Sequence, residues 1–451
     1  MSGDGRRGVR ARWRALDRAG RAVGGFVVLG LAVRVVWVIA VARTPPGFND
    51  PVEYLRLGLS IAHGHGYTSD AGFPTAYYPV GYPAFIAVVA WPVLHSPLRD
   101  HVAPVVELVQ ALLSAATVLA MAVVAWSVIG RRAAVATAAV LALWPNLVFH
   151  TGVLLSETLF NALVAAVLVT LLVVADDPSG ARWPASLTTK RLVGAGVLLA
   201  LAALVRSTAL LALPVLLIVA LVARVPRRRA LVVTGVVTLT TIVVLAPWTI
   251  RNAVRMHAFV PISTNIGDDL CLGRYPGATG WFAVTPYCQG NPDVAPQDVE
   301  VARDHRNTRQ AIHWAVHDPY REVRLAGWRF SYTYTSDHDA LFAADAYGTA
   351  PQVDAGTADV LGRVADDYFF VALVLAVAGA GVFVRDGGGR AWFVVVLGVA
   401  FALAPLAFFG DSRFHVPAIL FAALPAAVVL ERVPPVLASA RAGRATRDAT
   451  A

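Results

Sequence analysis

Long apolar runs separated by short polar segments dominate the pattern of this chain. A helix needs about 20 apolar residues to cross the hydrocarbon core of a membrane. Within lipid, only a helix or a closed barrel satisfies its own backbone polar groups. The pattern therefore predicts an all-α polytopic membrane protein with about ten transmembrane helices. The runs cover 22–41, 105–129, 133–150, 154–175, 192–205, 208–223, 230–247, 368–384, 391–409 and 415–430.

Basic residues lie in short clusters between these runs and predict the orientation of the chain. If the N-terminus is cytoplasmic, the predicted cytoplasmic segments hold 22 of the 38 Lys and Arg residues, as the positive-inside rule requires. Both termini, the Arg-rich tail 1–21 and the tail 431–451, are then cytoplasmic, and the protein is a multi-pass protein of the plasma membrane. The apolar run 80–95 would reverse every later loop if it crossed, so we expect a helix at the outer interface. The segments 44–104 and 248–367 then lie outside.

Composition agrees with this class. The chain has 451 residues, of which 57% are hydrophobic and 15% charged, whereas soluble domains average about 25% charged residues. The net charge of +9 comes from the orientation clusters rather than from one basic face, so we expect no nucleic-acid partner.

The outer segment 248–367 separates a transmembrane module, 22–247, from the C-terminal transmembrane helices, 368–430. Helical spacing at 296–316 and 319–332 predicts a small, mostly helical extracytoplasmic domain. Its two cysteines, Cys271 and Cys288, are the only ones in the chain. On the oxidising side of the membrane they are expected to form a disulfide.

The chain contains no phosphate-binding loop, dinucleotide fingerprint, zincin motif or C-x-x-C pair. Instead, polar residues collect at the predicted outer ends of the helices. Ionisable groups at this level are costly unless they face a cavity, and a substrate with a lipid tail and a charged head would suit such a cavity. These residues are Asp50, Glu53, Tyr54, Glu157, Arg206, Arg251, Asn252, Arg413 and His415.

A series of short motifs resembles the bacterial GT-C glycosyltransferases. It is most similar to the branch that uses polyprenyl-phosphate sugars, which includes protein O-mannosyltransferases and the aminoarabinose transferases of lipid A. The resemblance covers most of residues 30–430 and implies that an acceptor hydroxyl displaces the polyprenyl phosphate in line, with inversion, while an acidic residue of the first outer loop acts as base. After Asp50, Glu53 and Tyr54, the motifs are GHGY (64–67), PTAYYPVGYP (74–83), LSETLF (155–160), VRST (205–208), PWTIRN (247–252), FVPIST (259–264) and DSRFHVP (411–417).

Asp50 fits this base, because a general base must reach the acceptor hydroxyl in a site that limits water. The same stretch is also a good helix start, with Asp50 as N-cap, Pro51 at the first position and Glu53 closing a capping box. The two interpretations are compatible, because a carboxylate has two oxygens. A role of Glu53 as base or metal ligand is the alternative to the cap.

The leaving phosphate needs cationic donors. We rank Arg251 and Arg413 ahead of Arg206, and the alternative for each is an interfacial arginine that extends its charged head into water. Arg34, within the first helix, is expected to pair internally, with Glu157 as the candidate partner. Glu157 itself is either a structural partner or a substrate contact.

Aromatic and amide side chains complete the expected site. The tyrosines could stack on a sugar, although aromatic residues are expected at a membrane interface regardless. We expect no cofactor and no metal site, with a divalent ion at Asp268 and Asp269 as the open alternative. The expected supporting residues are Tyr54, Tyr78, Tyr82, Asn252 and His415.

The sequence thus predicts a membrane glycosyltransferase that moves a mannose- or arabinose-like sugar from a polyprenyl-phosphate donor. The acceptor would be a hydroxyl of an envelope glycan, lipid or protein. A lipid-linked saccharide transporter is one alternative, but it would place charges near the membrane midplane, and here they gather at one end. The other is an oligosaccharide ligase or polymerase, which would show an Arg-rich large loop, whereas here acidic residues accompany the arginines.

Overall fold

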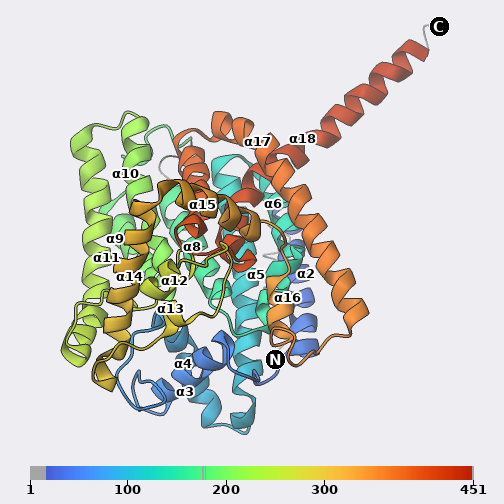
Figure 1. Cartoon of the computed structure of the whole chain (residues 1–451). Helices are drawn as coiled ribbons and strands as arrows, with labels where there is room; N and C mark the ends of the chain where they lie inside the picture. Colours follow the sequence, from blue (N-terminus) through green and yellow to red (C-terminus); the bar gives the residue numbers. More distant parts are fainter. Residues whose placement is uncertain (1–16, 175–176, 178, 449–451) are drawn as a thin grey trace.

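The structure is a computed structural model that describes residues 17–174, 177 and 179–448. Most of the predicted tail 1–21 and the last residues of the tail 431–451 lie outside the described residues. Within them the fold is helical, as predicted, and the only β pairing consists of two isolated bridges, Thr68–Pro74 and Trp281–Gly410. Figure 1 shows long helices, among them α2, α5, α9, α11 and α17, running roughly alongside one another as a bundle.

Each predicted apolar run contains helix over most of its described residues. The helices of the bundle are α2 (Arg18–Val41), α5 (Val102–Val128), α6 (Arg131–Ala142), α7 (Pro145–Phe149), α8 (Glu157–Leu172), α9 (Thr189–Val205), α10 (Ala212–Val222), α11 (Arg227–Met256), α17 (Ala355–Leu403) and α18 (Val416–Asp448).

Helix length and composition identify candidate membrane spans among the described residues. Five described helices are long and apolar enough to cross, or six if the bent pair formed by α6 with α7 and the turn after it is one span. Three helices are short: α8 has 16 residues, α9 has 17 and α10 has 11. Two predicted runs, 368–384 and 391–409, merge into α17, which Gly388 kinks with φ 58° and ψ −141°. The count of ten stays a prediction.

Shorter helices cover one end of the bundle. The segment after α2 contributes α3 (Asp50–Ala62) and α4 (Gly81–Leu94), and α4 is the helix predicted at 80–95. Gly81 lets α4 approach α9 closely, because an added Cβ would lie 2.6 Å from the Leu204 carbonyl oxygen. The first turn of α4 is therefore fixed beside the end of α9, where Arg206 follows.

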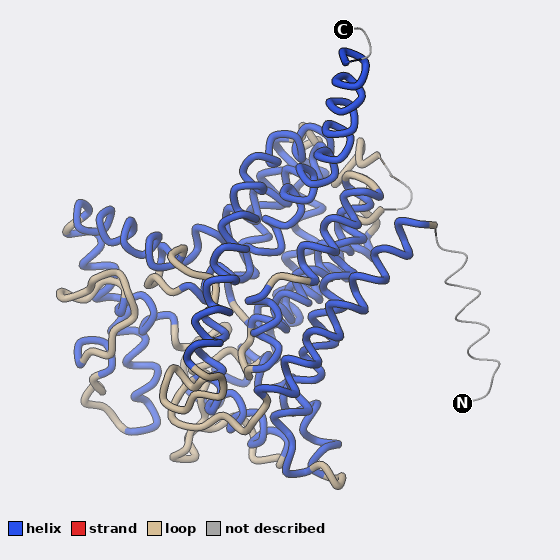
Figure 2. The backbone as a smooth tube through the Cα atoms, turned by 90° about the vertical axis from the view of Figure 1, so that its right-hand side faces the viewer, coloured by secondary structure: helices blue, strands red, loops and turns tan. Residues whose placement is uncertain are grey.

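The segment 248–367 is also mostly helical. Its helices are α12 (Ile266–Leu272), α13 (Pro286–Gln289), α14 (Val299–His317), α15 (Pro319–Thr333) and α16 (Asp339–Ala344). The predictions at 296–316 and 319–332 are confirmed by α14 and α15. Figure 2, turned by 90°, shows helices set to one side of the bundle and joined by long loops.

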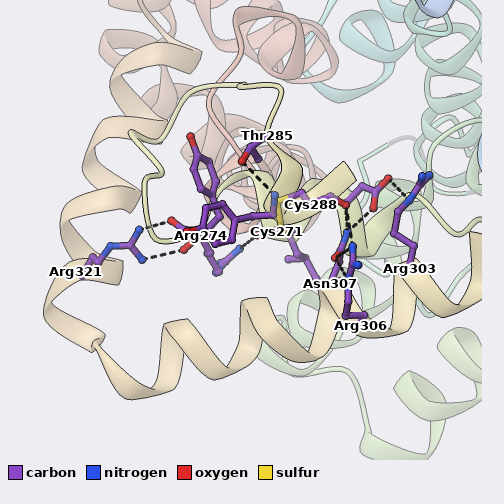
Figure 3. Close-up of a disulfide and its surroundings, with 12 residues drawn as sticks. Cys271, Arg274, Thr285, Cys288, Arg303, Arg306, Asn307 and Arg321 are labelled. Carbon is purple, nitrogen blue, oxygen red and sulfur yellow. Dashed lines mark hydrogen bonds and ion pairs between the residues drawn. A yellow bond between two sulfur atoms is a disulfide. The ribbon is translucent and has the colours of Figure 1, made fainter. Parts of the chain in front are cut away.

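A disulfide joins α12 to α13 through Cys271 and Cys288. Both sulfurs are fully buried, in a small apolar cluster that includes Leu272 and Phe409. Asn307 of α14 donates to the Cys288 carbonyl oxygen over 2.7 Å, as Figure 3 shows. The disulfide thus links α12, α13 and α14 into one unit.

Candidate active site

One large cavity lies where the short helices meet the bundle, with a volume of about 1880 Å³. Its walls come from distant parts of the sequence, so the cavity exists only in the folded chain. The lining residues lie in the segments 48–57, 69–79, 155–156, 205–208, 265–272, 281–303, 332–347 and 401–417.

Asp50 lines this cavity as the first residue of α3. The sequence predicted Asp50 as the N-cap of this helix, and this prediction is wrong. The N-cap is Asn49, whose side chain accepts from the Val52 backbone nitrogen. Asn and Asp are equally good N-caps, and the one-residue shift leaves the Asp50 carboxylate free for other contacts. Its side chain is 32% exposed.

Two partners hold the Asp50 carboxylate. The Tyr78 hydroxyl donates to Oδ1 over 2.8 Å, and Arg413 forms an ion pair with Oδ2. Burial, and after it the charge of Asp50, raises the pKa of Tyr78, so the phenol stays protonated and remains a donor. The carboxylate is therefore fixed in orientation at the cavity wall.

Glu157 is the second acidic group of this cluster and is completely buried. It pairs with both Arg206 and Arg413. The expected partnership with Arg34 is absent from the described contacts, because the Arg34 guanidinium donates to Ser114 Oγ and to the Leu141 and Ala142 carbonyl oxygens. Glu157 is thus a structural partner that orients two guanidinium groups toward the cavity.

The two cations of the cluster differ in their remaining hydrogen-bond capacity. Arg413 uses Nε, Nη1 and Nη2 in its contacts with Glu157 and Asp50. Among the described residues, Arg206 uses only Nη1, toward Ser156 and Glu157. Its other nitrogens retain donors for an incoming anion, although the sequence ranked Arg206 last of the three arginines.

Arg251 and Asn252 do not line the cavity. Arg251 donates to the carbonyl oxygens of Tyr67 (2.6 Å) and Thr75 (2.7 Å), and its guanidinium lies over the Trp248 ring. Asn252 is buried and donates to the Val260 carbonyl oxygen. Arg251 therefore holds the loop that leads to Tyr78. Asn252 accepts from Arg251 and supports it from behind.

The other predicted supporting residues separate into two groups. Glu53 and Tyr54 line the cavity, where Glu53 binds Arg56 instead of closing a capping box. Burial raises the pKa of Tyr54 to about 12. Tyr82 is fully buried against Tyr54 and donates to Gln110, so its ring cannot stack on a sugar in this arrangement.

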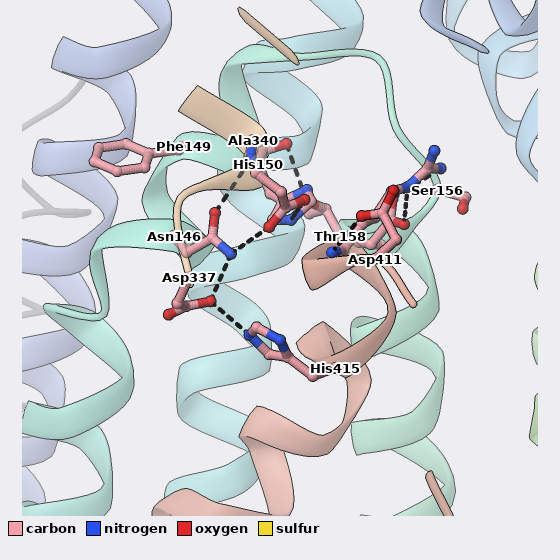
Figure 4. Close-up of polar contacts among 12 residues, drawn as sticks. Asn146, Phe149, His150, Ser156, Thr158, Asp337, Ala340, Asp411 and His415 are labelled. Atoms are coloured by element: carbon pink, nitrogen blue, oxygen red, sulfur yellow. Dashed lines mark hydrogen bonds and ion pairs between the residues drawn. The ribbon is translucent and has the colours of Figure 1, made fainter. Parts of the chain in front are cut away.

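His415 lies in a buried polar network with Asp337 and Asn146 (Figure 4). Its Nε2 lies 2.9 Å from Asp337 Oδ1, and Asp337 also accepts from Trp144 and Asn146. Burial raises the pKa of Asp337, against the hydrogen bond from His415, which lowers it. The network fixes the segment before Asp339, which itself lines the cavity.

Asp268 and Asp269 line the cavity on the wall formed by α12. Asp268 is engaged by Tyr77, Asn307 and Arg303. Burial, followed by the charges of Asp268 and Asp50, raises the pKa of Asp269 to about 8, so it is mostly protonated at neutral pH. Over the described part of the chain, no three His, Cys, Asp or Glu side chains are grouped to hold a metal ion.

Glu300 of α14 is a positioning residue that the sequence did not reveal. Its carboxylate accepts from Thr75 Oγ1 (2.6 Å), the Ala76 backbone nitrogen (2.8 Å) and Thr264 Oγ1 (2.6 Å). With Arg251, it anchors the loop that carries Tyr78. No local signal marks Glu300, because it is one of several charged residues on an amphipathic helix.

No protein-family model matches the sequence, and no curated protein matches it significantly. Solved structures do resemble it. The apo oligosaccharyltransferase of Archaeoglobus fulgidus has a TM-score of 0.56 at 16% identity, covering 94% of this chain and 52% of that chain. The oligosaccharyltransferase AglB from Archaeoglobus fulgidus, in complex with an inhibitory peptide and a dolichol-phosphate, gives 0.53 at 15% identity, covering 93% of this chain and 52% of that chain.

ArnT from Cupriavidus metallidurans, bound to undecaprenyl phosphate, gives a TM-score of 0.43 at 16% identity, covering 85% of this chain and 77% of that chain. This value is below the level that establishes a shared fold. The TM-score to the archaeal enzyme is above that level, although this chain spans only about half the length of that protein. The chain shares the fold of that enzyme, which is a GT-C fold.

Proposed function

We propose that this chain, a membrane protein with the GT-C fold, is a glycosyltransferase that takes a sugar from a polyprenyl-phosphate donor. It would pass the sugar to a hydroxyl of an envelope acceptor at the extracytoplasmic face, with both termini in the cytoplasm. The observation that carries the proposal is the meeting of Asp50, Arg206 and Arg413 at one wall of a large cavity.

The cavity has the two kinds of surface that a lipid-borne phosphate needs. Arg206 and Arg413 supply positive charge at one wall, and the aromatic side chains Trp281, Phe282 and Phe409 line another part. Guanidinium groups bind phosphate through charge-assisted hydrogen bonds. The complex of the archaeal enzyme with a dolichol-phosphate supports a donor of this class.

The proposed reaction is a single displacement. The acceptor oxygen attacks the anomeric carbon while the bond from that carbon to the phosphate oxygen breaks, and the hydroxyl proton passes to Asp50. The polyprenyl phosphate departs with the bonding electrons, and Arg206 stabilises its new charge. Attack from the face opposite the leaving group inverts the anomeric centre. Tyr78 and Arg413 keep the Asp50 carboxylate aimed at the acceptor.

A donor with a diphosphate-linked oligosaccharide is the second candidate. It is favoured by the shared fold, because the similar solved structures are of an oligosaccharyltransferase. Purified protein should therefore be tested with a polyprenyl-phosphate hexose, a polyprenyl-phosphate pentose and a polyprenyl-diphosphate oligosaccharide. Turnover of one monophosphate donor alone would support the first proposal, and turnover of the diphosphate donor alone would replace it.

Asp50→Asn tests the base directly. We expect kcat to fall by about 10²- to 10⁴-fold, as for loss of a general base, while the donor lipid still binds. Asp70→Asn is a matched control, because Asp70 lines the same cavity but is 72% exposed and pairs with Arg56. Unchanged turnover by Asp50→Asn would exclude Asp50 as the base.

A further inference from the structure

The corner between α14 and α15 exposes an apolar surface that the proposed reaction does not use. Ile312, Val316, Tyr320 and Val323 are 56%, 69%, 80% and 74% exposed, and these four residues form what we call the corner surface. Residues three or four apart lie on one face of a helix. Ile312 and Val316 therefore share a face of α14, and Tyr320 and Val323 share a face of α15.

Contacts at the C-terminal end of α15 join the helix that carries half of this corner to the bundle. Arg329 donates to the Leu406 carbonyl oxygen over 2.8 Å, and Tyr334, which follows α15, donates to that of Ala402 over 2.7 Å. Both acceptors belong to the end of the candidate membrane span Ala355–Ala407. The C-terminal end of α15 is thus held beside the end of this candidate span. In Figure 1, α14 runs from the end of the molecule that contains α3 and α4 toward α15.

Charge beside the corner surface complements a phospholipid head group. Arg309 and Arg324 are exposed, and so are His313 and His317 on α14. Two acidic residues lie near the turn: Asp318 caps α15, and Glu322 pairs with Arg274 and Arg329. An apolar face bordered by arginines is the pattern of a helix that lies in the interface of a membrane with anionic lipids.

We propose that the corner surface rests in the leaflet on the Asp50 side of the membrane. Val316 and Val323 enter the boundary between head groups and acyl chains, and Arg309 and Arg324 lie among anionic phosphates. Tyr332, near the C-terminal end of α15, lines the cavity. Contact of α15 with lipid therefore places one cavity wall at the membrane surface. This proposal does not depend on the reaction assigned to the cavity.

Single-cysteine labelling tests the proposal in the full chain. The only two cysteines of the protein are joined in the disulfide, so an introduced cysteine is the only free thiol. Val316→Cys and Val323→Cys are each labelled with an environment-sensitive fluorophore and reconstituted in phosphatidylcholine vesicles with and without phosphatidylglycerol. Asp298→Cys is the control, because Asp298 is exposed and lies 18 residues before Val316, about 27 Å away along a helix.

For labels at positions 316 and 323 we expect blue-shifted emission. Lipids with brominated acyl chains should quench this emission. The label at position 298 should emit as in water and should not be quenched. Charge reversal by Arg309→Glu with Arg324→Glu should reduce the quenching in vesicles that contain phosphatidylglycerol. Water-like emission at both corner positions would overturn the proposal. A blue shift without lipid quenching would also overturn it, since it would show contact with a second copy or another protein.

Discussion

The anchoring of the Tyr78 loop by Glu300 gives a quantitative prediction. Glu300→Ala removes a carboxylate that accepts three hydrogen bonds, one of them from the Ala76 backbone nitrogen. A hydrogen bond to a charged group contributes about 1.5–3 kcal/mol. If the hydrogen bond of the Ala76 amide loses about 2 kcal/mol of stabilisation, the population of the state in which this amide is exposed to water rises roughly 30-fold.

Hydrogen exchange of the purified protein, read by mass spectrometry, measures this population. We expect peptides covering 74–78 to exchange about 30-fold faster in Glu300→Ala, because amide exchange reports local opening. Peptides from α5 and α8 should be unchanged. Turnover should also fall, because the Tyr78 hydroxyl orients Asp50 from the end of the same loop.

Glu300→Gln is the matched control. Its amide oxygen can still accept from Ala76 and Thr264, and its amide group can donate to Thr75 Oγ1. We expect exchange close to that of the natural protein. If Glu300→Ala leaves exchange over 74–78 unchanged, the carboxylate does not hold the loop and the reasoning fails.

Three further predictions concern the same part of the molecule. Arg206→Ala should weaken donor-lipid binding by about 10- to 100-fold, the loss expected for one or two charge-assisted hydrogen bonds, as measured by titration with the donor lipid. Between about pH 4 and 8, folded protein keeps a proton on Asp269 that the unfolded chain has lost. Stability should therefore decrease as the pH rises through this window, and Asp269→Asn should flatten the dependence of the thermal midpoint on pH. Replacing Cys271 and Cys288 by serine should destabilise the unit of α12–α14 by about 3 kcal/mol, the value for closure of a loop of this size, seen as faster proteolysis.

Each of these has a clear contrary result. Donor affinity of Arg206→Ala equal to that of the natural protein would remove Arg206 from the phosphate site. A pH dependence that Asp269→Asn leaves intact would assign the effect to another group. Proteolysis of 271–317 at the natural rate in the serine variant would show that packing alone holds this unit.

The apolar pattern predicted where the helices of the bundle lie along the chain. Helices that face lipid need long apolar runs, and such runs are evident in the sequence. It did not predict their lengths: α10 has only 11 residues because residues 207–211 form a 3-10 turn before it. Two of the predicted runs lie on either side of Gly388 within α17, and the non-helical φ and ψ of Gly388 turn the chain between them.

The sequence predicted which types of residue gather at one end of the bundle. It did not predict which side chains these residues contact. Arg206 follows α9 in an extended conformation, whereas Arg251 lies within α11. The sequence does not show this difference in backbone, on which the direction of each side chain depends. The choice of Asn49 over Asp50 as the cap has a similar cause. Both suit the position, and the pull of Tyr78 and Arg413 on Asp50 lies far outside the local sequence.

The bridge made by Arg413 has a consequence for the synthesis of the protein. Its partners Asp50 and Glu157 lie 363 and 256 residues earlier in the chain. At the usual speed of translation, about 5–20 residues per second, the newly inserted Glu157 waits roughly 13–50 s for this guanidinium. During that interval Arg206, made far sooner, is the one of its two partners that is already present. A nascent chain cut short before the last membrane helix would thus leave Asp50 without its ion pair to Arg413, a defect that a quality-control protease could recognise.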